Sequence, residues 1–293
     1  MLGITAVLLV AVLIPGLGQS VNGSSRWIGR GPVTIQPSEL TKFALIAFVA
    51  SLLTRRASRM DRPELTVRPV VVVLVGLSGL LLLQPKLGTP IILAAIALLM
   101  LFVAGARISS LASWAMAGGL LAVLAAYAVP YRRARLLAFV DPWADPLGNG
   151  LQTIQSQVGI ASGGFFGVGL GASRTKWGFL PFAHTDFIFA IVAEEIGLIG
   201  AGALILSFLL FGLFGVRAAL GARDRFGMLL ATGITTWLLL QAFLNMGMAI
   251  GLLPITGEPL PFVSAGGSSL VMTLGATGIL ASVARGARPT TPS

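Results

Sequence analysis

Residues 180–195 read Leu-Pro-Phe-Ala-His-Thr-Asp-Phe-Ile-Phe-Ala-Ile-Val-Ala-Glu-Glu, and they mark the change from a long polar loop to a strongly apolar segment. Asp186 lies at that junction, and Glu194 and Glu195 follow deeper in the apolar segment. Carboxylates inside a membrane-spanning segment are energetically costly, so they are functional candidates by default. The stretch therefore predicts a membrane helix that begins beside a candidate polar site.

The composition of the whole chain agrees with a bilayer environment. Hydrophobic residues make up 56% of the 293 residues and charged residues only 10%, whereas a soluble domain carries about 25% charge. The chain has no cysteine and one histidine, which excludes disulfides, thiolate metal sites and a histidine-rich metal site. The net charge of +10 is typical of arginines on the cytoplasmic side and of contacts to anionic lipids, so no nucleic acid partner is expected.

Hydropathy predicts an all-α polytopic membrane protein. A membrane helix needs about 20 mostly apolar residues, and eight stretches qualify: 2–20, 34–53, 69–85, 89–106, 110–129, 186–215, 226–253 and 267–284. One set of short loops, together with the C-terminal tail, holds eleven of the twenty basic residues: Arg55, Arg56, Arg59, Arg62, Arg68, Arg107, Arg217, Arg223, Arg225, Arg285 and Arg288. The positive-inside rule makes that side cytoplasmic, with both termini inside.

The outer side then carries a long loop at 130–185. Loops of this length are usually functional or disordered, but this one contains aromatic residues such as Trp143 and Trp177, unlike a disordered linker. We expect it to fold back against the helices as short amphipathic or re-entrant pieces, with close backbone approaches at the glycines of 163–171. The chain is expected to form one integral membrane domain over 1–293.

Asp186 has two compatible interpretations at this junction. It is a favourable N-cap for the following helix, and it is a proton acceptor if substrate approaches from the loop side. His184 is the rival acceptor because its ordinary pKa lies nearest neutrality, although it also suits a polar loop at the membrane interface. Glu194 and Glu195 are about 12–13 Å deeper than Asp186, so structural pairing with a basic or backbone donor is favoured over a proton pathway.

Other polar residues are placed near the same outer face. Glu39 and Lys42, three positions apart on one helix face, predict either a self-neutralising pair or a polar patch facing an internal cavity. Arg132 and Lys176 are basic residues on the outer side, where phosphate groups or anionic lipid headgroups are the expected ligands. The segment 254–269, with Ser264 and Ser268, combines prolines with a Gly-Gly-Ser-Ser helix start, which is a weak signal for an anion site.

Taken together, these motifs resemble the SEDS family (shape, elongation, division and sporulation; FtsW, RodA and SpoVE) of bacterial peptidoglycan polymerases. The matching pieces run in family order: 26–28, 36–42, 84–89, 130–132, 141–146, 155–156, 163–164, 167–171, 180–189, 194–195, Asn245, 253–254, 259–264 and 266–269. The pattern is closer to the FtsW-type division branch than to the RodA-type elongation branch, because of 169–173 and 264–268.

The resemblance implies a fold of ten transmembrane helices, of which this chain shows eight, so the first two family helices are expected to be absent. It also implies that the essential aspartate of the family is Asp186 and that its polar cavity pair is Glu39 and Lys42. Lys86 and Phe182 depart from the family pattern, where acidic residues are usual, and Ala265 replaces a usual tyrosine.

The activity implied by the resemblance is glycosyl transfer. SEDS proteins polymerise lipid II into glycan strands on the outer face, and in this chain Asp186 would be the general base for the attacking sugar hydroxyl. Basic residues, with a divalent cation (Mg²⁺ or Mn²⁺) held by Asp186 or Glu39, would stabilise the departing pyrophosphate. No organic cofactor is expected. The implied partners are lipid II, the nascent strand, a class B penicillin-binding transpeptidase and other divisome membrane proteins at the septum.

Three other functions compete with a division polymerase. A lipid II flippase would use Glu39, Lys42, Glu194 and Glu195 as a polar pathway, but the densest polar motifs lie on the outer side instead of at the midplane, where transporter sites usually lie. A RodA-type elongation polymerase would share the chemistry and differ in its cellular role. A non-catalytic division scaffold would tolerate loss of the Asp186 carboxylate.

Overall fold

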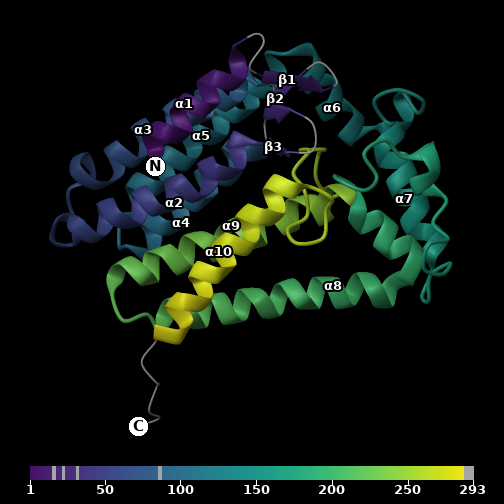
Figure 1. Cartoon of the computed structure of the whole chain (residues 1–293). Helices are drawn as coiled ribbons and strands as arrows, with labels where there is room; N and C mark the ends of the chain where they lie inside the picture. The colour runs from purple at the N-terminus through teal and green to yellow at the C-terminus, as the bar shows by residue number, and fades with distance from the viewer. Residues whose placement is uncertain (15–17, 22–23, 31–32, 85–87, 287–293) are drawn as a thin grey trace. The chain divides into compact units, whose positions relative to one another are not determined.

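A computed structural model describes residues 1–14, 18–21, 24–30, 33–84 and 88–286 and is mainly helical (Figure 1). The helices are α1 (Leu2–Leu13), α2 (Pro37–Arg55), α3 (Pro63–Leu83), α4 (Gly88–Val103), α5 (Ile108–Tyr127), α6 (Pro130–Val140), α7 (Leu151–Gly163), α8 (Ile188–Leu220), α9 (Arg225–Ala249) and α10 (Gly267–Gly286). Three short turns are η1 (Ala57–Arg59), η2 (Pro142–Ala144) and the π-helical η3 (Thr175–Phe179).

Among the described residues, six helices are long and apolar enough to cross a membrane: α2, α3, α5, α8, α9 and α10. Two of the eight expected spans, at α1 and α4, are shorter apolar helices. Only 6% of the apolar window of α5 is buried, and an apolar helix surface left uncovered in this way suits contact with lipid. The chain is a multi-pass membrane protein.

The expected first span, 2–20, is wrong at Ile14 and at 18–20, while residues 15–17 lie outside the described part of the chain. Helix α1 ends at Leu13, and Ile14 has an extended backbone, as expected for a residue that precedes a proline. Strands β1 (Gly18–Val21), β2 (Ser24–Arg30) and β3 (Val33–Ile35) then form a small antiparallel sheet in the order β1-β2-β3. Hydropathy alone did not predict this sheet, because its strands are only three to seven residues long.

The described chain divides into two compact units, and the first contains Met1–Gly119, Phe211–Leu238 and the C-terminal part from Gly267. Within it, α2 is central and packs against α1, α3, α4 and α10, while the sheet contacts α1, α2 and α10 (Figure 1). Pro37 starts α2 at a position where its missing N–H is not needed. The inner face of α2 is fully buried at Leu45, Ile46 and Val49.

The second unit comprises Leu120–Leu210 and Leu239–Gly266. It contains the whole of the expected 130–185 loop, within which lie the short pieces α6, η2, α7 and η3. Its core gathers buried apolar residues from the 180–193 segment, from α8, from α9 and from the loop after α9, among them Phe187, Phe208, Ala242 and Leu260. This packed core therefore anchors the turn that precedes α8.

Candidate functional site

The turn that carries Asp186 is fixed by its own backbone. The amides of Thr185 and Asp186 donate to the carbonyl of Phe182 at 3.1 and 2.9 Å. Phe182 has φ 59°, a left-handed conformation that bulky residues rarely adopt. Residues in such conformations persist where the surrounding structure holds them, and they are concentrated at functional sites. Fully buried Phe187 follows Asp186 and ties the turn to the core.

Three consecutive carbonyls in this turn each accept a hydrogen bond from outside it. We call this arrangement the carbonyl clamp; it comprises the Ala265 N–H on the His184 carbonyl at 3.0 Å, the Ser264 hydroxyl on the Thr185 carbonyl at 2.5 Å, and the Asn245 side-chain amide on the Asp186 carbonyl at 2.7 Å. The donors come from α9 and from the loop that follows it. These three hydrogen bonds therefore hold the main chain of 184–186 in place.

The Asp186 side chain is half-buried and lies beside Gly257. A Cβ atom at Gly257, which has φ 69°, would lie 3.6 Å from Asp186 Oδ2. The main chain of the 257–258 segment is held in turn, because the second N–H of the Asn245 amide donates to the Glu258 carbonyl at 2.8 Å. The carboxylate thus lies against a backbone whose position is set by the same asparagine.

His184 and Ser264, two other predicted site residues, belong to the same region. The His184 side chain is exposed, which matches the interfacial loop interpretation as well as the proton-acceptor one. The Ser264 hydroxyl donates to the Thr185 carbonyl and accepts from the Leu260 N–H at 2.7 Å. The hydroxyl thus donates one hydrogen bond to main chain and accepts one from it, and the predicted contact to pyrophosphate stays a prediction.

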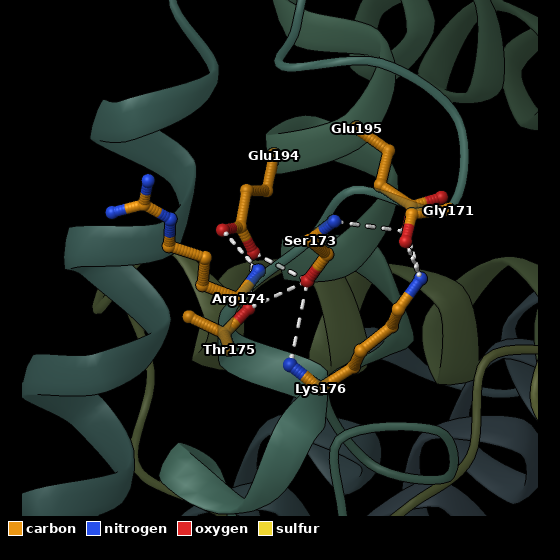
Figure 2. Close-up of polar contacts among 7 residues, drawn as sticks. All are labelled: Gly171, Ser173, Arg174, Thr175, Lys176, Glu194 and Glu195. Carbon is orange, nitrogen blue, oxygen red and sulfur yellow. Dashed lines mark hydrogen bonds and ion pairs between the residues drawn. The ribbon is translucent and has the colours of Figure 1, made fainter.

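Glu194 and Lys176, with their neighbours, form a second polar cluster (Figure 2). The Glu194 carboxylate is buried and accepts from the Ser173 hydroxyl at 2.5 Å, from the Arg174 N–H at 2.9 Å and from the Thr175 hydroxyl. Every donor lies in the short segment that enters η3. Of the two interpretations offered by the sequence, these contacts correspond to structural pairing.

Glu195 binds the same segment from the next position of α8 (Figure 2). Its Oε1 forms an ion pair with Lys176 at 2.6 Å, and the Lys176 ammonium also donates to the Gly171 carbonyl at 2.6 Å. The Ser173 N–H donates to the same carboxylate at 3.3 Å. Lys176, predicted to bind pyrophosphate, thus has its charge partly neutralised within the protein.

Helix α8 is interrupted just after these glutamates. Gly197 has φ 72° and ψ −164°, which is not helical. The freed groups find partners in the glycine-rich segment, since Val168 N donates to the Glu194 carbonyl and Leu198 N donates to the Gly164 carbonyl, both at 2.9 Å. A Cβ at Gly197 would lie 2.4 Å from Gly167 N. Backbone contacts of this kind are how an irregular segment can be tolerated at membrane depth.

Glu39 and Lys42 form a fully buried ion pair near the start of α2. Glu39 Oε1 lies 2.8 Å from Lys42 Nζ, and both side chains are 0% exposed. The Lys42 ammonium also lies 5.3 Å from the ring centroid of buried Trp237, a cation–π distance. Glu39 Oε2 has no hydrogen-bond partner within the described part of the chain. The pair is therefore neutralised, with one carboxylate oxygen still available to a proton or a donor.

Ser268 and Arg132 complete the predicted set. The Ser268 hydroxyl donates to the Thr34 carbonyl at 2.7 Å and accepts from the Gln36 N–H at 3.2 Å, which fastens the residues just before α2. Arg132, on α6, is largely buried and donates to the Ala125 carbonyl at 3.3 Å. Burial lowers the pKa of Arg132 from its ordinary value.

The structure also identifies residues to which the sequence assigned no role. Asn245 and Trp237 are both 0% exposed, yet one holds the Asp186 turn and the other faces Lys42. An asparagine within a predicted membrane helix is a signal that is present in the sequence itself. The contact partner of a tryptophan cannot be predicted from its position in the sequence. Lys86, one of the departures from the family pattern, lies outside the described residues.

The carboxylates of the described residues decide whether the expected divalent cation could be bound. No group of three or more His, Cys, Asp or Glu side chains that could hold a metal ion occurs in the ranges that the structure describes. Mg²⁺ is commonly bound by only one or two carboxylates together with substrate phosphates. Either Asp186 or Glu39 provides one such carboxylate, so the donor set fits a cation that binds together with a phosphorylated substrate.

Comparison with known proteins gives consistent matches along the chain. The family model described as a cell cycle protein, FtsW/RodA/SpoVE, matches residues 1–289. A probable peptidoglycan glycosyltransferase FtsW of Thioalkalivibrio sulfidiphilus is 46% identical over 292 residues, which cover 97% of this chain and 72% of that protein. Stage V sporulation protein E of Bacillus subtilis is 43% identical over 281 residues, which cover 96% of this chain and 77% of that one.

Solved structures agree with the sequence matches. A structure from a peptidoglycan synthase complex, in which polymerization and crosslinking are coordinated, superposes with a TM-score of 0.79 at 34% identity. The match covers 97% of this chain and 79% of that one. The similarity extends over the helices of both units.

Proposed function

The chain belongs to the FtsW/RodA/SpoVE family, and from that premise we propose that it is a peptidoglycan glycosyltransferase that polymerises lipid II during septal wall synthesis. Its relatives at 43–46% identity include proteins named for this activity. The proposed active site surrounds Asp186 on the outer face of the membrane. Both termini are proposed to be cytoplasmic.

The observation that carries this proposal is the fixed position of Asp186. Its carboxylate is half-buried beside Gly257, and its main chain is held by the carbonyl clamp. A general base needs to be within hydrogen-bond reach of the proton that it removes. It is more effective when its position is set before substrate binds, because misplacement by about 1 Å can reduce the rate about 100-fold.

In the proposed reaction, a sugar hydroxyl of one lipid-linked unit attacks the anomeric carbon of the growing strand. The new bond joins that oxygen to the anomeric carbon, while the bond from this carbon to the phosphate oxygen breaks. The hydroxyl proton passes to the Asp186 carboxylate, and undecaprenyl pyrophosphate leaves with the bonding electrons. The catalytic step thus needs one proton acceptor and positive charge near the leaving group.

Arg132 is the proposed source of that positive charge, with the sequence also favouring Lys42, whose charge is neutralised by Glu39, and Lys176. Lys176 is the weaker choice, because its ammonium already has Glu195 and Gly171 as partners. A divalent cation such as Mg²⁺ or Mn²⁺ would supply further charge neutralisation when bound with the pyrophosphate. Asp186 or Glu39 would hold it.

The partners follow from the same proposal. The substrates are lipid II and the nascent strand, and a class B transpeptidase would crosslink the product beside the polymerase. This part is supported by the solved relative, which comes from a complex that coordinates polymerization and crosslinking. Other divisome membrane proteins are expected to recruit the pair to the septum.

A lipid II flippase is the second candidate, and the buried Glu39–Lys42 pair favours it. Ionised groups inside a spanning segment often mark a polar pathway, and Glu39 Oε2 has no hydrogen-bond partner among the described residues. An elongation polymerase of the RodA type would share the chemistry at Asp186. The two polymerase roles differ in where the protein acts in the cell.

The purified chain, reconstituted in liposomes with its transpeptidase, distinguishes polymerase from flippase. Fluorescent lipid II is supplied on one leaflet, and glycan length and leaflet exchange are measured in the same sample. We expect glycan strands to form and leaflet exchange to stay at the rate of protein-free liposomes. Exchange without glycan strands would favour the flippase and contradict the proposal.

A further inference from the structure

We propose that Asn245 and Ser264 are positioning residues for Asp186 and that they act through its main chain. This inference rests on the proposed function, because it assumes that Asp186 is the general base. Neither residue needs to touch substrate in this account. Each sets where the carboxylate lies by holding the carbonyl next to it, which assigns Ser264 a different task from the predicted pyrophosphate contact.

Several hydrogen bonds converge on one short piece of main chain at Thr185 and Asp186. Asn245 and Ser264 hold the carbonyls of Asp186 and Thr185 at 2.7 and 2.5 Å. The amides of the same two residues donate to Phe182. With its amide and its carbonyl both engaged, the backbone of Asp186 retains little freedom, and the direction of its Cα–Cβ bond is fixed with it.

Asn245 holds both the Asp186 turn and the segment that lies beside the carboxylate. Its two N–H groups donate to the carbonyls of Asp186 and Glu258, and Gly257 lies beside Asp186 Oδ2. One buried side chain thus sets the Asp186 turn and the segment that it faces. A substitution at Asn245 would therefore move the Asp186 turn and the 257–258 segment relative to each other. Substitution of a core residue that bonds to neither segment would not have this specific effect.

The burial of the Asn245 side chain also points to a specific role. The side chain is 0% exposed, and its Oδ1 has no hydrogen-bond partner among the described residues. An unsatisfied buried acceptor costs about 1–3 kcal/mol. An apolar residue of similar size would avoid that cost but would leave the carbonyls of Asp186 and Glu258 without their side-chain donor. The asparagine is therefore explained by a requirement for two N–H donors at these two carbonyls.

The test compares variants that remove a donor with variants that keep one. Asn245→Asp keeps the size of the side chain and removes the NH₂ group, and Ser264→Ala removes the hydroxyl, which Ser264→Thr retains. Ser156→Ala is the matched control, because the Ser156 hydroxyl donates at 2.7 Å to the carbonyl of Ala249 in the same unit and to none of the carbonyls of 184–186. Thermal melting of each purified protein shows that it is folded.

We expect Asn245→Asp and Ser264→Ala to lower kcat for lipid II polymerisation by about 10- to 100-fold, the loss typical of a misplaced catalytic group. The apparent KM should change less than threefold, and Ser264→Thr and Ser156→Ala should keep kcat within about threefold of wild type. In an Asp186→Asn background, Ser264→Ala should cause no further loss, because the residue acts only through the carboxylate.

Two results would overturn the inference. One is a kcat for Ser264→Ala and Asn245→Asp that equals that of Ser156→Ala; the other is an undiminished effect of Ser264→Ala when Asp186 is already Asn. Either result leaves the proposed function intact if Asp186→Asn by itself abolishes polymerisation. Full polymerisation by Asp186→Asn would instead overturn the base assignment, so the two failures are distinguishable.

Discussion

At the scale of single residues, the Glu39–Lys42 pair is the most demanding arrangement in the chain. Both side chains are fully buried, and removing one partner of a buried ion pair costs about 3–5 kcal/mol because the other charge is left uncompensated. We therefore expect Lys42→Met to destabilise the protein by an amount of this order. The shift in thermal unfolding midpoint in detergent measures it.

The double variant Glu39→Gln with Lys42→Met is the control for that prediction. It removes both charges, so it should recover most of the lost stability. A double variant as unstable as Lys42→Met would mean that lysine packing against Trp237, instead of the charge, is what stabilises this region. Recovery of stability without recovery of polymerisation would indicate that the pair also has a functional role.

The sequence identified these residues better than it identified their contacts. Asp186, Glu39 and Lys42 stood out because charge is rare in apolar segments. The pairing of Lys176 with Glu195 was not predicted, because the partners are 19 positions apart and meet only when the π-helical η3 folds back onto α8. The role proposed for Asn245 depends on two backbone carbonyls, and backbone positions are what a single sequence predicts least.

At the scale of elements, the central feature is the interruption of α8. Gly197 combines a left-handed φ with a Cβ position 2.4 Å from Gly167 N. Gly197→Ala should therefore strain the backbone and push the glycine-rich segment away. We expect a loss of at least about 1–3 kcal/mol, measured as a lower thermal unfolding midpoint.

A matched substitution tests whether that loss is specific to the break. Gly202 lies five positions further along α8, and apart from the neighbouring backbone of α8 itself no atom of the described residues lies within 4 Å of the Cβ that an alanine would add there. Gly202→Ala should be neutral or slightly stabilising, because alanine has the higher helix propensity. Equal destabilisation by both variants would contradict the close backbone contact at Gly197.

The Glu194 cluster gives a second prediction at this scale. Glu194→Gln keeps the shape of the side chain but replaces one acceptor oxygen with an NH₂ group, so hydroxyl donors in Ser173 and Thr175 lose their charged partner. Hydrogen bonds to charged groups contribute about 1.5–3 kcal/mol. We expect faster hydrogen exchange in residues 171–177, measured by mass spectrometry, while amides in α2 exchange at the wild-type rate.

Element positions were largely predictable, and their irregularities were not. Hydropathy located an apolar helix in each of the eight expected stretches, because lipid-spanning segments carry a strong composition signal. The break at Gly197 gave no such signal, since glycine is common in membrane helices. The sheet at 18–35 was missed because short strands that contain polar residues resemble an ordinary connecting loop.

At the scale of the whole molecule, the proposed orientation can be mapped directly because the chain has no cysteine. Single cysteines at exposed Ser58 and exposed Leu147 report on the two proposed sides of the membrane. We expect a membrane-impermeant maleimide to label Leu147→Cys in intact spheroplasts and to label Ser58→Cys only after permeabilisation. The reverse pattern would place Asp186 on the cytoplasmic side and contradict the proposed active-site face.

The most direct measurement of the central claim is lipid II polymerisation by purified Asp186→Asn protein with its transpeptidase. Asparagine retains the size of the side chain and its backbone hydrogen bonds but cannot accept the hydroxyl proton. Replacement of a general base typically costs about 100- to 10,000-fold in rate, so we predict glycan synthesis at or below 1% of the wild-type rate, with an unchanged thermal unfolding midpoint. Polymerisation at the full rate by the folded variant would contradict the assignment of Asp186 as the base.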